Sequence, residues 1–194
     1  QMRTQGEDIG EILWLMGLRP QWLSEHSDKV IGLEVIPLSE LGRPRLDVVS
    51  RISGLLRDTF PTLITLLDEA VQLVLSLDEP IEANWVKKHY VEEVAELRAA
   101  GIDPETARQE AKLRVFGCPP GTYGGGVAVL IETKQWQSSD DLGETAITWG
   151  CHAYSQELHG RVSRGAFERK LARVEATVKN QNVIGFDLYD IDDE

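Results

Sequence analysis

The segment NWVKKHYVEE, residues 84–93, gathers three side chains that could move protons or hold a metal ion. His89, Glu92 and Glu93 lie within five residues, and on a helix the carboxylates at i+3 and i+4 share a face with the imidazole. Imidazole and carboxylate groups bind divalent metals and transfer protons near neutral pH. The spacing is not H-E-x-x-H, which excludes a zinc-protease site. The alternative is a solvated helix face that two neighbouring lysines share.

A second cluster with chemical potential consists of four arginines within fifteen residues, Arg43, Arg45, Arg51 and Arg57. The guanidinium group binds carboxylates through two parallel N–H donors. These side chains could therefore bind acidic groups of a substrate. They could equally form internal salt bridges with the two aspartates of the same segment, and the sequence leaves both interpretations open.

The stretch GCPPGTYGGG, residues 117–126, holds five glycines and two prolines. None of its glycines is followed by the Lys-Ser or Lys-Thr of a phosphate loop, and the dinucleotide pattern G-x-G-x-x-G is absent. The prolines also remove backbone N–H donors that would bind a phosphate. We therefore predict a tight turn with positive φ angles, which lets the backbone approach a neighbour closely. That neighbour could be a flat ligand.

The segment WGCHAYS places Cys151, His152 and Tyr154 together. A Cys-His pair can act as nucleophile and base, but sequence neighbours rarely face each other. We favour a helix end with a buried cysteine and a hydrogen-bonded histidine. Cys118 and Cys151 are the only cysteines in the sequence, which is too few for a disulfide framework.

These residues belong to a chain of 194 residues with 42% hydrophobic and 27% charged side chains, as in globular proteins with a core. The formal net charge of −12 disfavours nucleic acid and anionic lipid as partners. The sequence shows no signal peptide and no apolar run long enough to span a bilayer, so we expect a cytoplasmic location. The first methionine is at position 2 and the last residues are an acidic run. We therefore expect an internal piece of a longer polypeptide.

The hydrophobic pattern predicts a mainly helical α/β module with a few short strands. The whole chain, 1–194, reads as one module, with a subdivision near 101–120 as the alternative. Strands are expected at 30–36 and 46–53, the second with a helix as its alternative, whereas 113–116 could end a helix or form a strand. Helices are expected at 8–16, from Phe60-Pro61 to Leu77, before Gly101, after a cap at Asp103, after a cap at Ser139, and from Ser163 through Phe167, Leu171, Val174 and Val178.

Several of these stretches together resemble one family. LGRPRLDVVSRISGLLRDTFPTLITLLDEAVQLV, LDEPIEANWVKKH, RVFGCPPGTYGGGV and DLGETAITWGCHAY occur in the order expected for the large subunit of the cobalt chelatase (CobN) and magnesium chelatase (H subunit) family. GLRPQW and VIPLSELGRPR extend the resemblance over nearly the whole chain. The arginine-rich stretch is its most specific part, and FGCPPGTYGGGV and WGCHAY are similar to the cobalt branch.

The resemblance implies a segment of the subunit that binds a tetrapyrrole and inserts the metal. The reaction is a ligase step that forms nitrogen–metal bonds, with Co²⁺ and a corrin precursor of cobalamin as substrates, or Mg²⁺ and protoporphyrin. Separate AAA+ subunits would use the ATP, and this segment would bind no cofactor of its own. The alternatives are a structural segment of the same subunit or a docking surface for the AAA+ partners.

Metal insertion must strip water from the ion and remove two pyrrole protons, which suggests roles for the residues above. We expect His89 with Glu92 or Glu93 to handle metal or protons, with His89 as the metal ligand. The candidates for contact with the ring or its substituents are Arg43, Arg45, Arg57, Gly121, Tyr123 and Gly124. The arginines could instead serve the structure.

Two departures from the family pattern concern the substrate. WGCHAY stands where much of the family has a Gly-Gly pair, and the tail GFDLYDIDDE, residues 185–194, lacks a histidine expected before its aspartates. A relative that acts on another ring or another metal is therefore an open alternative.

Overall fold

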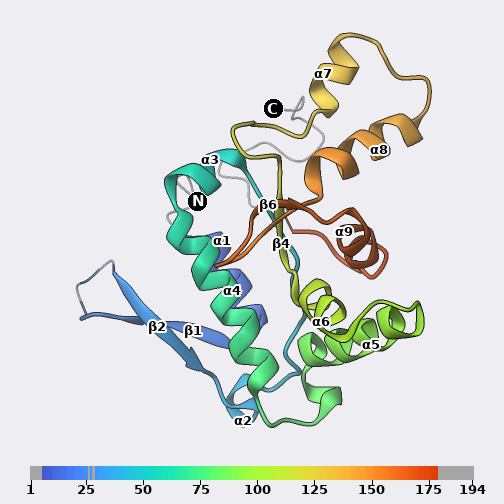
Figure 1. The fold of residues 1–194 in the computed structure, drawn as a ribbon. Coiled ribbons are helices and arrows are strands. Elements are labelled where there is room, and N and C mark those ends of the chain that lie inside the picture. Colours follow the sequence, from blue (N-terminus) through green and yellow to red (C-terminus); the bar gives the residue numbers. More distant parts are fainter. Residues whose placement is uncertain (1–5, 26, 28, 179–194) are drawn as a thin grey trace.

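Two small sheets and the helices around them make up the part of the chain that the computed structural model describes, which is residues 6–25, 27 and 29–178 (Figure 1). The first sheet is an antiparallel hairpin of β1 (Leu18–Trp22) and β2 (Val30–Val35). The second has the strand order β3-β4-β5-β6. Its first pair is parallel and the other two are antiparallel. The fold is mixed α/β and mainly helical, as the sequence pattern predicts.

The helices have the following bounds in chain order: α1 (Glu7–Leu15), α2 (Leu38–Leu41), α3 (Gly54–Thr59), α4 (Pro61–Ser76), the short 3₁₀ helix η1 (Ile81–Ala83), α5 (Trp85–Ala99), α6 (Pro104–Lys112), α7 (Val127–Glu132), α8 (Ser139–Gly150) and α9 (Arg164–Leu171). The strands of the second sheet are β3 (Ser50–Ile52), β4 (Val115–Gly117), β5 (His152–Tyr154) and β6 (His159–Val162).

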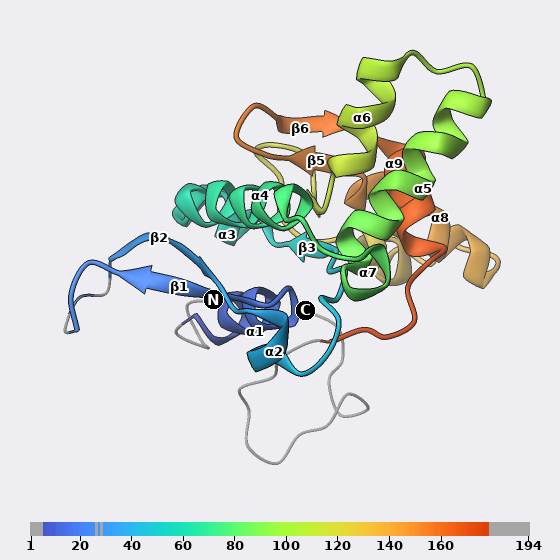
Figure 2. The ribbon, with the colours of Figure 1, turned by 90° about the horizontal axis from the view of Figure 1, so that it is seen from below.

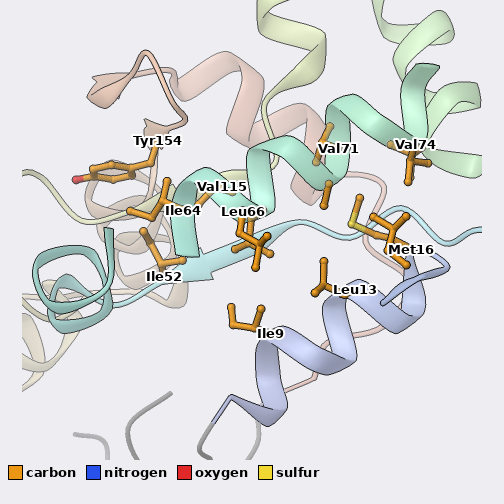
Figure 3. Packing of buried hydrophobic residues seen from close by; sticks show 14 residues of the cluster. Ile9, Leu13, Met16, Ile52, Ile64, Leu66, Val71, Val74, Val115 and Tyr154 are labelled. Atoms are coloured by element: carbon orange, nitrogen blue, oxygen red, sulfur yellow. The ribbon is translucent and has the colours of Figure 1, made fainter. Parts of the chain in front are cut away.

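The main core forms around α4, which is apolar on most of its surface. Figure 2 shows α4 between α1 with the first hairpin on one side and the β5–β6 hairpin on the other. The buried side chains come from elements far apart in the sequence (Figure 3): Ile9, Leu13 and Met16 from α1, Ile64, Leu66, Val71 and Val74 from α4, and Ile52, Val115 and Tyr154 from the second sheet. Burial of this apolar surface fixes the second sheet and α1 against one helix.

A smaller core lies on the other face of the second sheet, toward α8 and α9. Phe116 of β4 is completely buried and contacts Phe167 of α9, with ring centroids 5.0 Å apart. Cys151 and Ala153 complete the cluster from the start of β5 and its centre. Because side chains alternate along a strand, β4 contributes to both cores and is the layer between them.

Local capping chemistry sets several element ends as expected. The Asp103 carboxylate accepts hydrogen bonds from the N–H groups of Glu105 and Thr106, both at 3.0 Å, and starts α6. Asn84 caps α5 in the same way through the N–H of Lys87. Gly17 has a φ of 75° and ends α1, as the sequence predicts.

Three boundaries differ from the sequence-based expectation. The strand expected at 46–53 is only β3, because β4 offers a partner edge of three residues. Both alternatives for 113–116 are found in part, since Leu113 caps the end of α6 and the strand β4 begins at Val115. Ser138, not Ser139, precedes α8, where the Asp141 carboxylate accepts from its N–H at 3.0 Å. The last helix ends at Leu171, and Val174 and Val178, which were expected to continue it, are exposed in the described part of the chain.

Other elements have no clear signal in the sequence pattern. These are β1, α2, β5 and β6, which are all five residues or shorter. β4 lies in the range 101–120, where a subdivision was the alternative, and it pairs with β3 on one side and β5 on the other. In the described part of the chain, no helix has the length and apolar character needed to cross a membrane. The tail 185–194 lies outside the described residues.

Arg45 ties the first hairpin, α1 and the end of α4 together. Its side chain is fully buried and forms a double hydrogen bond with the Glu79 carboxylate, both at 2.7 Å. The same guanidinium donates to the carbonyls of Gly17 at 2.7 Å and Ile36 at 2.9 Å. Gly17 must be glycine here, because a Cβ would overlap this guanidinium. All of these donors are used inside the chain, so Arg45 stabilises the fold.

We predict that Arg45→Met lowers the free energy of unfolding by about 3–5 kcal/mol, because the Glu79 carboxylate loses its partner in a partly buried place. Urea denaturation of the chain measures this change. The matched control is Arg19→Met, which breaks an exposed pair with Glu40 and should cost less than about 1 kcal/mol. Equal losses in the two variants would show that the buried contacts of Arg45 carry no special weight.

Candidate functional site

Apart from Arg43 and Arg45, which contact the end of α1, the candidate residues fall into two groups at opposite ends of α4. Arg57, Gly121, Tyr123 and Gly124 lie near α3, which precedes the first residue of α4. His89, Glu92 and Glu93 lie on α5, which follows the last residue of α4 (Figure 1). A sixteen-residue helix is ~24 Å long. The structure therefore brings together one part of the expected site and places the other part elsewhere.

Arg57 holds the glycine loop, residues 117–126, against α3. The side chain is 8% exposed, and its Nη1 donates to the carbonyl oxygen of Pro119 at 2.8 Å. Its Nη2 donates to the Thr122 carbonyl oxygen at 3.2 Å, and a double hydrogen bond joins it to Asp58 at 2.6 and 2.8 Å. The bond to Asp58 raises the pKa of Arg57 above its ordinary value. Arg57 thus positions the loop and has no N–H left for a ligand.

Tyr123 projects from this loop over the Arg57 guanidinium. The Arg57 Cζ lies 5.8 Å from the centre of the ring, and the Tyr123 hydroxyl donates to Asp58 Oδ2 at 2.8 Å. Hydrogen bonds from Arg57 and then from Tyr123 hold the pKa of Asp58 at about 2. The ionised carboxylate raises the pKa of Tyr123 in turn. The residue is 62% exposed, so an aromatic face in a fixed orientation is open to a ligand.

The glycines of the loop serve two different purposes. Gly121 and Gly124 have φ angles of 75° and 81°, and open space lies where a Cβ would stand. Gly125 and Gly126 instead sit against the side chains of Arg51 and Trp149. Close approach by the backbone is therefore found at 125 and 126, whereas 121 and 124 satisfy turn geometry and leave room beside Tyr123.

A pocket of about 350 Å³ opens on the other side of Arg57 and Asp58. Its walls come from the first turn of α4, from the loop, and from the turn between β5 and β6. The lining residues with polar side chains are Arg57, Asp58, Thr62, Thr65, Tyr154, Ser155, Gln156 and His159. The Tyr154 hydroxyl donates to the Cys118 carbonyl oxygen at 2.6 Å, which fixes the floor of the pocket to the loop.

The WGCHAYS segment forms the end of α8 and strand β5. Cys151 is buried, as expected, and burial raises the pKa of its thiol. The expected hydrogen bond of His152 is not found, because its buried Nδ1 has no partner within the described residues. Cys151 and His152 therefore do not form a nucleophile and base pair with a supporting acid.

Arg43 contacts the end of α1. Its Nη1 and Nη2 donate to the carbonyls of Leu15 at 2.9 Å and Trp14 at 2.6 Å. These carbonyls belong to the last turn of α1, whose negative end a cation stabilises. Like Arg45, Arg43 has contacts within the fold and none with the loop near Tyr123.

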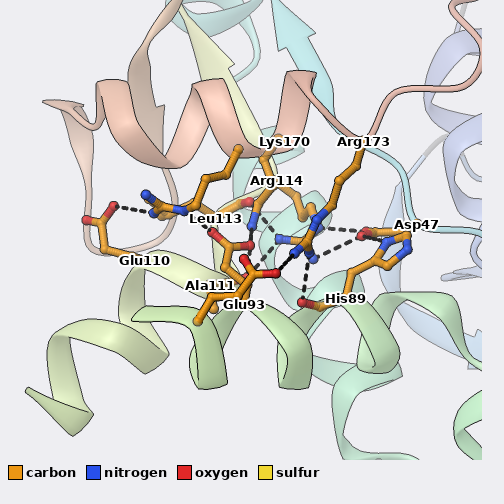
Figure 4. A network of polar contacts seen from close by, with 11 residues as sticks. Asp47, His89, Glu93, Glu110, Ala111, Leu113, Arg114, Lys170 and Arg173 are labelled. Carbon is orange, nitrogen blue, oxygen red and sulfur yellow. Dashed lines mark hydrogen bonds and ion pairs between the residues drawn. The ribbon is translucent and has the colours of Figure 1, made fainter. Parts of the chain in front are cut away.

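His89 forms a hydrogen bond with Asp47, which lies before β3 and far from α5 in the sequence. Its Nδ1 lies 2.8 Å from Asp47 Oδ2, and Asp47 also accepts from Arg114 at 2.6 and 3.0 Å (Figure 4). Burial favours the neutral acid, but Arg114 and His89 outweigh it and lower the pKa of Asp47. This contact orients the imidazole, as a carboxylate does for a metal-binding or basic histidine.

Glu93 lies one turn further along the same helix and is completely buried. It binds the Lys170 ammonium and accepts from Arg169 at 2.9 Å. Burial and the nearby Arg114 lower the pKa of Lys170 to about 8. Glu92 is exposed and has no side-chain partner within the described residues. His89 and Glu93 lie in one polar network, because Arg114 and Lys170 both donate to the Ala111 carbonyl (Figure 4). In the described part of the chain the two side chains have no direct contact, and Glu92 lies outside the network.

No group of three or more His, Cys, Asp or Glu side chains is placed to hold a metal ion in the described part. The partners that complete each site were difficult to find in the sequence. Asp58 follows Arg57 directly, and this adjacent pair of opposite charges was the available signal. The pairs Arg114–Asp47 and Lys170–Glu93 had no such signal, because their partners are separated by 67 and 77 residues in the sequence.

Comparison with known proteins shows that the chain is similar to subunits of metal chelatases. A family model described as CobN/Magnesium Chelatase matches residues 1–194. The aerobic cobaltochelatase subunit CobN of Sinorhizobium sp is 42% identical over 99% of this chain, and the chloroplastic magnesium-chelatase subunit ChlH of Oryza sativa subsp. indica is 35% identical over 98%. An uncharacterized protein of Methanocaldococcus jannaschii is 49% identical over 99%. The chain spans only 13–15% of the length of these relatives.

A solved structure shares the fold. The catalytic subunit of cobaltochelatase from Mycobacterium tuberculosis superposes with a TM-score of 0.77 and 42% sequence identity. The alignment covers 87% of this chain and 14% of that protein. By identity, the cobaltochelatase subunits resemble this chain more than the rice magnesium-chelatase subunit does.

We predict that Asp58→Asn lowers the pKa of Tyr123 toward the ordinary value of about 10, because the phenolate no longer faces a carboxylate. Absorbance of the tyrosinate during a pH titration of the chain measures the change. The same titration of Tyr123→Phe, with and without Asp58→Asn, assigns the signal. Identical titration curves for Tyr123 with and without the carboxylate would contradict the contact.

Proposed function

The chain belongs to the CobN/magnesium chelatase family, and on this premise we propose that it is a segment of the tetrapyrrole-binding large subunit of a cobaltochelatase. The reaction would insert Co²⁺ into a corrin precursor of cobalamin in the cytoplasm. The higher identity to CobN proteins supports cobalt as the metal. Insertion of Mg²⁺ into protoporphyrin is the second candidate, favoured by the similarity to the rice subunit.

The observation that carries a ring-binding role is the exposed face of Tyr123. A macrocycle is flat and apolar on its faces, and aromatic side chains bind such surfaces by stacking. The hydroxyl of Tyr123 is held by Asp58 and its ring lies over Arg57, so little conformational freedom is lost on binding. The open space at Gly121 and Gly124 lets a flat ligand reach the ring without meeting a side chain.

The roles of the arginines follow from their contacts. Arg45 and Arg57 use their N–H groups inside the chain, and Arg43 binds helix carbonyls. We propose that these three position the fold and the loop, and that they bind no ring substituent directly. This is the structural alternative that the sequence left open for the arginine-rich segment.

His89 is the candidate for metal or proton handling with the best supporting geometry. Asp47 holds its Nδ1, and the other ring nitrogen remains for a proton or a metal ion that is delivered as substrate. Its distance from the loop means that one ring does not contact Tyr123 and His89 together in this arrangement. We therefore propose that His89, with Glu92 nearby on α5, acts on the metal ion or on protons before or after the ring is bound.

ATP would be used by separate AAA+ subunits. The absence of a phosphate loop from the sequence supports this division of labour. The segment would then supply surfaces for the ring and for the metal ion, and the energy for insertion would come from its partners.

We expect Tyr123→Ala in the complete subunit to weaken tetrapyrrole binding by roughly 2- to 10-fold, the range typical of one aromatic contact. Tyr123→Phe keeps the ring face and should bind within about twofold of the unmodified protein. Quenching of porphyrin or corrinoid fluorescence and absorbance changes give both affinities. Equal binding by all three proteins would remove Tyr123 from the ring site.

We further expect His89→Ala to lower the rate of metal insertion by about 100-fold or more, the lower end of the range for loss of a proton-transfer group, with little loss of ring binding. The assay uses the complete subunit with its AAA+ partners and follows metallated product. Lys88→Ala is the matched control, because Lys88 is an exposed residue of the same helix with no side-chain partner among the described residues. An unchanged insertion rate would remove His89 from the mechanism.

A further inference from the structure

Arg51 differs from the neighbouring arginines because its charge is not matched inside the described part of the chain. Arg45 and Arg57 each bind a carboxylate through two hydrogen bonds. The guanidinium of Arg51 has neither an acidic partner nor a carbonyl acceptor among the described residues. Arg98 on α5 is the other described arginine whose side chain has no hydrogen bond or ion pair among the described residues. In a chain with 32 acidic and 20 basic residues, such an unmatched arginine is unusual.

The position of Arg51 is built by the fold. Alternation along β3 places Ile52 in the core beside α4 and turns Arg51 to the opposite face, toward α8 and α9. Two glycines make room for its guanidinium. A Cβ at Gly125 would lie 2.9 Å from Arg51 Nη2, and a Cβ at Gly150 would lie 3.4 Å from its Nε. The charged group therefore lies between two stretches of bare backbone.

An apolar hollow lies directly beside this charge. It has a volume of about 140 Å³, and its other lining residues are Ala146 and Ile147 of α8 and Phe167 and Leu171 of α9. A ligand that fits here needs an apolar portion for the hollow and a negative group for the guanidinium. A carboxylate on a short alkyl chain meets both requirements, since the guanidinium can bind it through two parallel N–H groups.

The glycine loop connects this hollow with Tyr123. The Thr122 carbonyl accepts from Arg57, and Gly125 lies beside Arg51. The loop therefore runs from Arg57, which is paired with Asp58, to Arg51, which has no acidic partner among the described residues. We propose that Arg51 binds a carboxylate side group of the tetrapyrrole whose ring lies against the loop at Tyr123. This inference rests on the proposed function and assigns a contact that fixes the orientation of the ring.

The test uses the complete subunit with two metal-free probes, a corrin precursor with free carboxyl groups and its methyl ester, which differ in the charge and methylation of those groups. Arg51→Gln should weaken binding of the free acid by about tenfold or more and leave the affinity for the ester within about twofold. Arg98→Gln, which removes an equally unmatched positive charge from α5, should change neither affinity. Gly125→Ala should act like Arg51→Gln, because its Cβ displaces the guanidinium.

The outcomes separate this inference from the proposed function. If the unmodified subunit binds neither probe, the ring-binding function fails and the Arg51 contact fails with it. If the unmodified subunit binds and Arg51→Gln changes neither affinity, or weakens acid and ester equally, only the carboxylate contact is wrong. Unchanged ester binding by Arg51→Gln also shows that the variant is folded.

Discussion

The structure depends on buried arginines whose N–H groups are all accepted within the chain. Arg45 shows this most clearly, because one guanidinium joins Glu79 to the carbonyls at the end of α1 and the end of β2. Removing such a cation from water is costly unless each donor finds an acceptor. The need to pair every donor therefore fixes the relative positions of segments that are far apart in the sequence. It also requires glycine at position 17, because a side chain there would overlap the Arg45 guanidinium.

The same constraint explains where function is possible. Arg57 donates hydrogen bonds to Asp58 and to three loop carbonyls, which hold the glycine loop in a fixed position. The glycine loop carries Tyr123, whose ring lies over Arg57, and its Gly125 lies beside Arg51. Of the four arginines in the arginine-rich segment, Arg43, Arg45 and Arg57 stabilise the fold. Arg51 has no acidic partner among the described residues and is available to bind a ligand. The second network, around Asp47 and Glu93, ties α5 to β4 and α9 in a similar way (Figure 4).

Much of the helical architecture was evident from the sequence, because its signals are local. The apolar length of α4, the Asp103 cap and Gly17 each act within a few residues. The short strands of the second sheet were harder, since three-residue strands have no useful periodicity and depend on partners far away in the chain. The pairing of Glu93 with Lys170 shows the same limit for the site, because shared helix spacing with His89 gave no information about α9. The role of Gly125 and Gly150 beside Arg51 also required the fold.

The central claim is that a tetrapyrrole binds at the glycine loop of this segment. The most direct measurement is a spectroscopic titration of the 194-residue chain and of the complete subunit with a metal-free corrin precursor and with protoporphyrin. We expect saturable binding by the chain itself, and we expect both proteins to bind the corrin precursor more tightly than protoporphyrin. Binding by the complete subunit alone, with none by the chain, would contradict the claim and leave this segment as a scaffold for a site formed elsewhere.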